Sequence, residues 1–157
     1  MRAVIRKAKP NELRIVQNLN VGLFKSDGPR DKFLNHQWPY QEGEKYFKKR
    51  IKGGNGVCFV AEVSGEIVGY LAGAIMKTES WRTIKRKTEL ENMFVKEKYR
   101  GKGIGAKLVA EFFKWSKERE ATCAFVAAYA TNDKAIRFYK KVNFVPYSAT
   151  LEAYLTK

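Results

Sequence analysis

A glycine-rich loop between an apolar strand and an amphipathic helix restricts most strongly what this chain can fold into. The loop reads Tyr99-Arg100-Gly101-Lys102-Gly103-Ile104-Gly105. Its glycines allow a tight turn and a close approach of backbone to a ligand, because no Cβ intervenes. The helix that follows presents unbonded N–H groups and a partial positive charge at its first turn. Lys102 and Lys107 add full charges nearby. The pattern therefore predicts a cradle for a pyrophosphate.

Two familiar phosphate-binding patterns do not describe this loop. No Gly-Lys-Ser or Gly-Lys-Thr closes it, which excludes a P-loop. The spacing Gly101-x-Gly103-x-Gly105 is too short for a dinucleotide-binding fingerprint, and no βαβ unit begins before it. The alternative is a strand-to-helix turn without a ligand. The three glycines and the two flanking lysines favour the anion site.

The rest of the chain alternates apolar runs with helical patterns. Residues 57–63 form an apolar run bounded by glycines, which is typical of a buried strand, and Ser64-Gly65 predicts a hairpin turn. The expected strands are 2–8, 57–63, 67–76, 88–95 and 122–129, with a closing strand or strand pair over 144–155. The expected helices cover about 11–24, 42–51, 104–118 and 133–142. This order predicts one α/β (α+β) domain over residues 1–157, with a mixed sheet.

The composition is compatible with several polyanionic partners and predicts neither a metal site nor a membrane span. The 31 Lys and Arg exceed the 16 acidic residues by fifteen, a field that attracts polyanions such as nucleic acid, acidic proteins or a phosphate-bearing cofactor. The alternative is a solvated surface that keeps the protein in solution. One His and two Cys form no plausible metal cluster, so no metal is expected. No segment has the length of a signal peptide or a bilayer span, which predicts a cytoplasmic protein that does not enter the membrane.

Two motifs together resemble the GNAT superfamily of N-acetyltransferases. The family's Gln/Arg-x-x-Gly-x-Gly/Ala pattern is matched by Arg100 to Gly105, and its Asn followed seven residues later by Tyr is matched by Asn132 and Tyr139. The order of elements agrees over essentially the whole chain. The resemblance implies a mixed, mostly antiparallel central sheet of six to seven strands flanked by about four helices. It also implies acetyl-CoA as co-substrate and direct attack by a primary amine in a ternary complex. The acceptor is left open between a small amine and a protein N-terminus or lysine.

The resemblance implies roles for particular residues. The strand before the glycine loop would lie along the pantetheine arm, and one of its N–H groups would stabilise the developing oxyanion. Tyr139 would protonate the leaving thiolate, or it could be a core aromatic residue. Asn132 would hold pantetheine, cap its own helix, or do both. The residues expected to contact acetyl-CoA are Met93, Phe94, Val95, Arg100, Gly101, Lys102, Gly103, Ile104, Gly105, Ala106, Asn132 and Tyr139.

Two carboxylates are candidates for the general base. Some family members place a Glu five residues before the Asn, but that position here is Ala127. Glu89 and Glu91 stand two apart on the predicted strand, so both side chains would share one face. Either carboxylate could accept the amine proton directly or through water, and either could instead be a surface or structural residue.

Acceptor choice would depend on the segments 22–46 and 77–87. The second is basic around Trp81, which disfavours polycationic acceptors and suits a peptide N-terminus with acidic neighbours, or a small amine bearing a carboxylate or phosphate. Two other functions are open: a CoA-binding sensor without catalysis, and a basic RNA- or ribosome-associated protein. An acidic or nucleic-acid-associated partner is compatible with the charge. Proteins of this resemblance are often dimers, so a homodimer is one expectation for the assembly.

Overall fold

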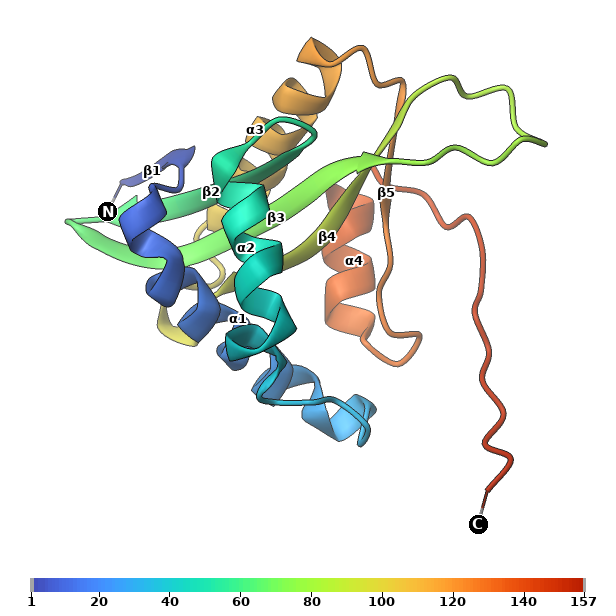
Figure 1. Cartoon of the computed structure of the whole chain (residues 1–157), viewed down its shortest axis with the longest axis horizontal. Helices are drawn as coiled ribbons and strands as arrows, with labels where there is room; N and C mark the ends of the chain where they lie inside the picture. Colours follow the sequence, from blue (N-terminus) through green and yellow to red (C-terminus); the bar gives the residue numbers. More distant parts are fainter. Residues whose placement is uncertain (1, 157) are drawn as a thin grey trace. The chain divides into compact units, whose positions relative to one another are not determined.

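The structure is a computed structural model in which residues 2–156 are described (Figure 1). It divides into two compact units, Met1–Ala127 and Ala128–Lys157. The sequence-based expectation of one domain over 1–157 stays a prediction. The strands are β1 (Ala3–Lys7), β2 (Gly56–Val63), β3 (Glu66–Met76), β4 (Lys87–Val95) and β5 (Cys123–Val126). The α-helices are α1 (Leu13–Asp27), α2 (Glu42–Lys52), α3 (Ile104–Glu118) and α4 (Asp133–Lys141).

The first unit contains a five-stranded sheet in the order β1-β2-β3-β4-β5. The first four strands pair antiparallel with their neighbours, and β5 joins β4 in parallel. The hairpin between β2 and β3 turns at Ser64 and Gly65, whose φ angles of 49° and 81° are those of a tight turn with a left-handed backbone. The sheet is therefore mixed and mostly antiparallel, as the sequence predicts.

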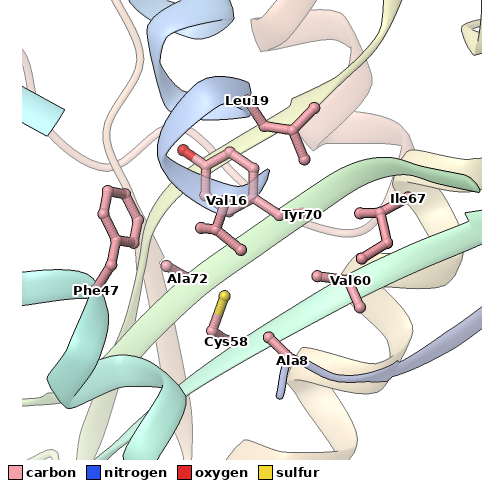
Figure 2. Close-up of a cluster of buried hydrophobic side chains, with 9 residues drawn as sticks. All are labelled: Ala8, Val16, Leu19, Phe47, Cys58, Val60, Ile67, Tyr70 and Ala72. Carbon is pink, nitrogen blue, oxygen red and sulfur yellow. The ribbon is translucent and has the colours of Figure 1, made fainter. Parts of the chain in front are cut away.

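Helices cover both faces of this sheet (Figure 1). On one face, α1 and α2 bury apolar side chains against β2 and β3, as Figure 2 shows for Val16, Phe47, Val60 and Tyr70. On the opposite face lies α3, whose Phe112 is fully buried. A Cβ built on Gly73 of β3 would lie 2.5 Å from the Phe112 ring, so only glycine lets this helix approach so closely. Of these helices, α2 and α3 begin and end within a residue or two of the bounds that the sequence predicts.

Two expectations about the sheet are wrong. The fifth strand covers only Cys123–Val126, because its pairing with β4 ends there. The closing strand or strand pair over 144–155 does not form, so the sheet has five strands rather than six or seven. Pro146 lacks the N–H that a ladder needs. The only regular element in the second unit's described residues is α4, which offers no strand for pairing. Val145 and Leu151 are accordingly exposed.

Cys58 is buried and Cys123 is half-buried, and neither is in a disulfide. Burial raises the pKa of the Cys58 thiol to about 12, so it is an inert core group. Among the described residues, no helix is both long and apolar enough to cross a bilayer. No group of three metal-ligating side chains occurs among residues 2–156.

Candidate active site

The glycine loop ends in a helix start that no side chain caps. Gly101 and Gly103 adopt φ angles of 73° and 81°, which L side chains rarely accept, and Gly103 is the N-cap of α3. A Cβ at either glycine would meet no atom within 4 Å, so neither is a glycine because of crowding. Within the described residues no backbone acceptor bonds the N–H groups from Gly101 to Ala106. These groups therefore lack a backbone partner at the positive end of the helix dipole, and open space surrounds Gly101 and Gly103.

The cationic side chains of the loop bond to backbone carbonyls. The Arg100 Nε donates to the Val95 carbonyl at 2.7 Å, and its guanidinium lies 5.1 Å from the centre of the Phe94 ring. The Lys102 Nζ lies 3.3 Å from the Lys98 carbonyl. Neither cation forms an ion pair with a carboxylate among the described residues. Arg100 thus ties the loop to the end of β4 while its charge stays available to an anion.

Strand β4 has a partner on both edges only along its first half. Its parallel pairing with β5 runs from Lys87 opposite Cys123 to Leu90 opposite Val126 and ends there. From Glu91 to Val95, β4 pairs only with β3. The edge of β4 that presents the backbone groups of Met93 and Val95 is therefore open along the stretch that leads into the glycine loop, whereas Phe94 directs its backbone groups to β3. An extended ligand arm can lie along such an edge and bond its backbone groups.

A β-bulge divides the two halves of β4. Ala72 of β3 lies opposite Asn92 and the next residue, Gly73, lies opposite Leu90, which leaves Glu91 as the extra residue. At the bulge, the alternation of side chains between the two faces of the sheet is interrupted. Thr88 bonds Ser116 of α3 at 2.8 Å, whereas Asn92 bonds α2 on the opposite face. In a regular strand residues four apart would share a face, so the bulge explains the switch.

Glu91 is held by a polar network built from α2 and β4. Its two carboxylate oxygens accept from the Arg50 guanidinium at 2.6 and 3.0 Å, and Oε1 also accepts from the Tyr46 hydroxyl at 2.9 Å. The Tyr46 hydroxyl in turn accepts from Asn92 Nδ2 at 2.9 Å. Burial raises the pKa of Tyr46, with the Glu91 charge adding to the shift, so the phenol stays protonated. The network fixes both residues of the bulge.

The network continues into the core beneath the bulge. The buried Tyr70 hydroxyl donates to Asn92 Oδ1 at 2.5 Å and accepts from Asn20 Nδ2 at 2.8 Å. Sequence reasoning missed the other members of this network, because they lie on α1, α2 and β3, far from β4 in the sequence. No periodicity or motif singles them out. The half-buried carboxylate itself is the one signal that a cation must lie nearby.

Glu89 differs from Glu91 in its surroundings. No hydrogen bond or ion pair holds its carboxylate within the described part of the chain, and it is half-buried. Burial raises the pKa of Glu89 above its usual range, and the nearby Glu91 charge adds to the rise. The opposing influences of Lys87 and Arg50 are smaller. A carboxylate with a raised pKa and no partner has the properties of a proton acceptor.

Asn132 and Tyr139 belong to the second unit. The Asn132 side chain accepts from the Ala135 N–H at 3.2 Å, so it caps α4, one of the two roles expected. The Tyr139 ring packs edge-on against Phe138 and Phe144, with ring centres 5.2 and 5.5 Å apart. The structure brings together β4, Glu89, Glu91 and the glycine loop within residues 2–127. The roles of Asn132 and Tyr139 beside acetyl-CoA stay predictions.

Known proteins with similar sequences are N-acetyltransferases. An uncharacterised N-acetyltransferase of Archaeoglobus fulgidus is 34% identical over 99 residues, which are 61% of this chain and 65% of that one. An N-alpha-acetyltransferase of Sulfurisphaera tokodaii is 32% identical over 116 residues, which are 71% of this chain and 67% of that one. The chain thus spans about two thirds of the length of these relatives.

Solved structures show the same fold. The aminoglycoside N-acetyltransferase AAC(6')-Iy, in its complex with the bisubstrate analogue CoA-S-monomethyl-acetylneamine, superposes with a TM-score of 0.79 over all of both chains. The identity is 14%, so this likeness concerns the fold alone. The model of the acetyltransferase (GNAT) family matches residues 29–144, which include β4, the glycine-capped α3 and the Asn132 cap. Since this match covers most of the sequence, the chain belongs to the GNAT family of acetyltransferases.

Proposed function

We propose that this protein transfers the acetyl group of acetyl-CoA to the α-amino group of a peptide or protein N-terminus. One observation carries the proposal: the second half of β4 is open along one edge and leads directly into an uncapped helix start. That edge suits an extended thioester arm, and the helix start suits the pyrophosphate at its other end. The relatives from Sulfurisphaera tokodaii and Sulfolobus acidocaldarius, both N-alpha-acetyltransferases, support the choice of acceptor.

Different residues of the first unit would bind the pyrophosphate and the pantetheine arm of acetyl-CoA. The N–H groups of Gly101 to Ala106 would bond the pyrophosphate, with Arg100 and Lys102 adding charge. Backbone groups of Met93 and Val95 would bond the pantetheine arm, whereas those of Phe94, also expected there, face β3. An N–H on this edge would also bond the thioester carbonyl oxygen as negative charge develops there. Asn132 and Tyr139 are proposed to complete the site, the Tyr139 hydroxyl returning a proton to the thiolate.

Glu89 is the proposed proton acceptor, and Glu91 is a positioning residue. Glu91 is already bonded to Arg50 and Tyr46, so it cannot accept a proton without losing that pair. The acceptor nitrogen attacks the thioester carbonyl carbon, the carbon–sulfur bond breaks, and the proton lost by nitrogen passes to Glu89. The sulfur leaves as a thiolate that takes up a proton. This is direct transfer within a ternary complex, with no acetylated residue on the protein.

The strength of the proposed base favours an α-amine over a lysine side chain. An α-amino group has a pKa of about 7.7–8.0, whereas a lysine ammonium has one of about 10.4. Deprotonating lysine at neutral pH therefore costs about 3 kcal/mol more. A carboxylate is a weak base, so Glu89 is better matched to the more readily deprotonated α-amine. The excess of fifteen positive charges also disfavours polycationic acceptors such as aminoglycosides.

The test combines acetyl-CoA binding with turnover. Gly103→Ala would place a methyl group at the uncapped helix start and strain the backbone, and Gly54→Ala is its matched control. Gly54 has a similar φ of 79° and equally open surroundings, but lies between α2 and β2. We expect acetyl-CoA affinity, measured by calorimetry, to fall about tenfold or more in Gly103→Ala and to be unchanged in Gly54→Ala.

Turnover is measured by thiol release with N-terminal peptides, ε-amine peptides and aminoglycosides as acceptors. The proposal expects the free α-amino peptides to be the best substrates. Equal losses of affinity in both glycine variants would contradict the proposed cofactor site. Faster turnover of an aminoglycoside would contradict the proposed acceptor. Binding without turnover of any amine would identify a CoA-binding sensor instead. The homodimer and the cytoplasmic location stay predictions from the sequence.

A further inference from the structure

The loop between β3 and β4 presents a tryptophan to solvent. This segment, residues 77–86, is called the Trp81 loop, and Figure 1 shows it extending beyond the end of the sheet. The Trp81 side chain is 80% exposed. Exposing a large indole forfeits the free energy that its burial would contribute, so an exposed tryptophan in an ordered loop is typical of a contact surface.

A buried ion pair holds this loop in place. The Lys87 ammonium donates to both carboxylate oxygens of Glu79, at 2.7 and 2.8 Å, and the Lys87 side chain is only 1% exposed. The Arg82 N–H donates to the Glu79 carbonyl at 3.1 Å, which closes a turn around Trp81. Burying an ammonium is costly even when it is paired. The fold thus uses a buried lysine to fix a turn whose outward residue is Trp81.

The Trp81 loop is strongly positive. Its one acidic residue, Glu79, is neutralised by Lys87, so the cations that remain carry a net charge. Lys77, Lys85 and Arg86 are exposed. Arg86 donates to the Arg119 carbonyl, a bond that leaves its charge uncompensated. A partner that contacts Trp81 therefore also meets several cations, which suits carboxylates or phosphates.

The loop lies at the acceptor end of the proposed site. It leads directly into β4, and Glu89 is two residues beyond Lys87, a distance of about 7 Å along a strand. The glycine loop lies past the other end of β4. Negative charge at Glu89 followed by positive charge on the loop matches a peptide whose ammonium terminus precedes acidic residues. The phosphates of an RNA would be repelled where they approached Glu89.

We propose that the Trp81 loop docks acidic residues of the acceptor, so that the enzyme prefers N-termini followed by Asp or Glu. This inference rests on the proposed function, since it concerns that acceptor. An extended peptide advances about 3.3–3.6 Å per residue. An N-terminus at Glu89 therefore brings roughly its third and later residues to the loop. Trp81 would pack on the peptide while Lys85 and its neighbours bond the carboxylates.

The test uses two peptides that share their first two residues and differ afterwards in carrying Glu or Lys. For the wild-type protein we expect kcat/KM to be about tenfold or more higher with the acidic peptide at low salt, since several charge pairs contribute about two- to fivefold each. The preference should fall severalfold in Trp81→Ala, in Lys85→Glu and at high salt. Lys117→Glu makes the same charge change on an exposed face of α3 and should leave the preference intact.

A second readout is independent of catalysis. An acidic peptide with a blocked N-terminus should shift the tryptophan fluorescence of the wild-type protein, and Trp81→Ala should abolish that shift. Equal kcat/KM for the two peptides would overturn the inference while leaving the proposed function intact. If no peptide is acetylated, the proposed function fails, and the fluorescence titration still decides whether the loop binds acidic chains. A single-stranded RNA that displaces the blocked peptide and binds more tightly through Trp81 would overturn the inference in favour of nucleic acid.

Discussion

The two halves of β4 have different tasks, although one strand contains both. From Lys87 to Leu90 the strand has partners on both edges, and Thr88 and Leu90 are almost completely buried. From Glu91 to Val95 one edge is open and the side chains are half-buried. The first half therefore serves the fold, whereas the second half leaves backbone groups available to a ligand. The β-bulge at Glu91 is the boundary between them.

The difference shows how an open strand edge can be kept in a defined place. A strand edge without a partner tends to move, to twist or to pair with another chain. Here the network from Arg50 through Glu91 and Tyr46 to Asn92 ties the start of the open half to α2. The paired half anchors the same strand to α3 through Thr88 and Ser116. The open edge is thus rigid at its origin, as a site for a developing charge requires.

The largest expected effect lies in the paired half, at Glu89, two residues before the boundary. Glu89→Gln removes the proposed proton acceptor but keeps its size, so kcat should fall by about 10²–10⁴-fold with acetyl-CoA affinity unchanged. Stability should not fall. The raised pKa of Glu89 means that its ionised form is disfavoured by folding, so the wild-type protein loses stability as pH rises through that pKa. The neutral variant escapes this loss at neutral pH.

Steady-state kinetics and thermal unfolding at pH 7 check this prediction together. Glu118→Gln, at an exposed position of α3, is the matched control and should leave both quantities near the wild-type values. A Glu89→Gln variant with near-normal kcat would show that Glu89 belongs with the folding half of the strand. A variant that loses both activity and stability would show that the carboxylate is structural.

The next effect concerns the half that serves the fold. Gly73 of β3 lies opposite Leu90, and a Cβ there would lie 2.5 Å from the Phe112 ring and 2.6 Å from the Glu89 carbonyl oxygen. Gly73→Ala should lower the free energy of unfolding by about 1–3 kcal/mol, because α3 or the strand must shift. The measurement is chemical denaturation.

Gly28→Ala is the control for the loss of a glycine. Gly28 has a helical φ of −48°, and its added Cβ would make only an ordinary contact of 3.7 Å with the His36 ring. Its stability should therefore stay within about 0.5 kcal/mol of the wild-type value. Equal stability of the Gly73 and Gly28 variants would mean that the first half of β4 is less tightly packed than its burial indicates.

The sequence predicts the elements that pack into the core better than it predicts the pairing of strand edges. Apolar runs and helical spacing locate β2, β3, α2 and α3 within a residue or two, because each buries a continuous face. The glycine loop is also predicted, since the φ angles of 73° at Gly101 and 81° at Gly103 favour glycine. The closing strand or strand pair that the sequence predicts over 144–155 does not form. A strand also needs a partner, which local sequence does not reveal.

The β-bulge and its network could not be read from the sequence for a related reason. A bulge is defined by the register between two strands, and nothing in residues 87–95 marks Glu91 as the extra one. On the regular pattern Glu89 and Glu91 are equivalent carboxylates on one face. The difference between them arises because Arg50 and Tyr46, some forty residues away, reach only Glu91.

The smallest expected effect tests whether that difference tunes the base. The Glu91 charge helps to raise the pKa of Glu89, after burial, while Arg50 lowers it. In Glu91→Gln the negative charge that raises the pKa of Glu89 is gone, while the positive charge of Arg50 that lowers it remains. The ionised form of Glu89 is therefore favoured. The acidic limb of the kcat/KM profile should move to lower pH, and the reverse shift is expected for Arg50→Met. Because burial is the larger cause, the limb in Glu91→Gln should still lie above the usual range of a glutamate. A merely structural role for the network would lower kcat/KM at every pH without moving the limb, and the bulge would then position the strand without tuning Glu89.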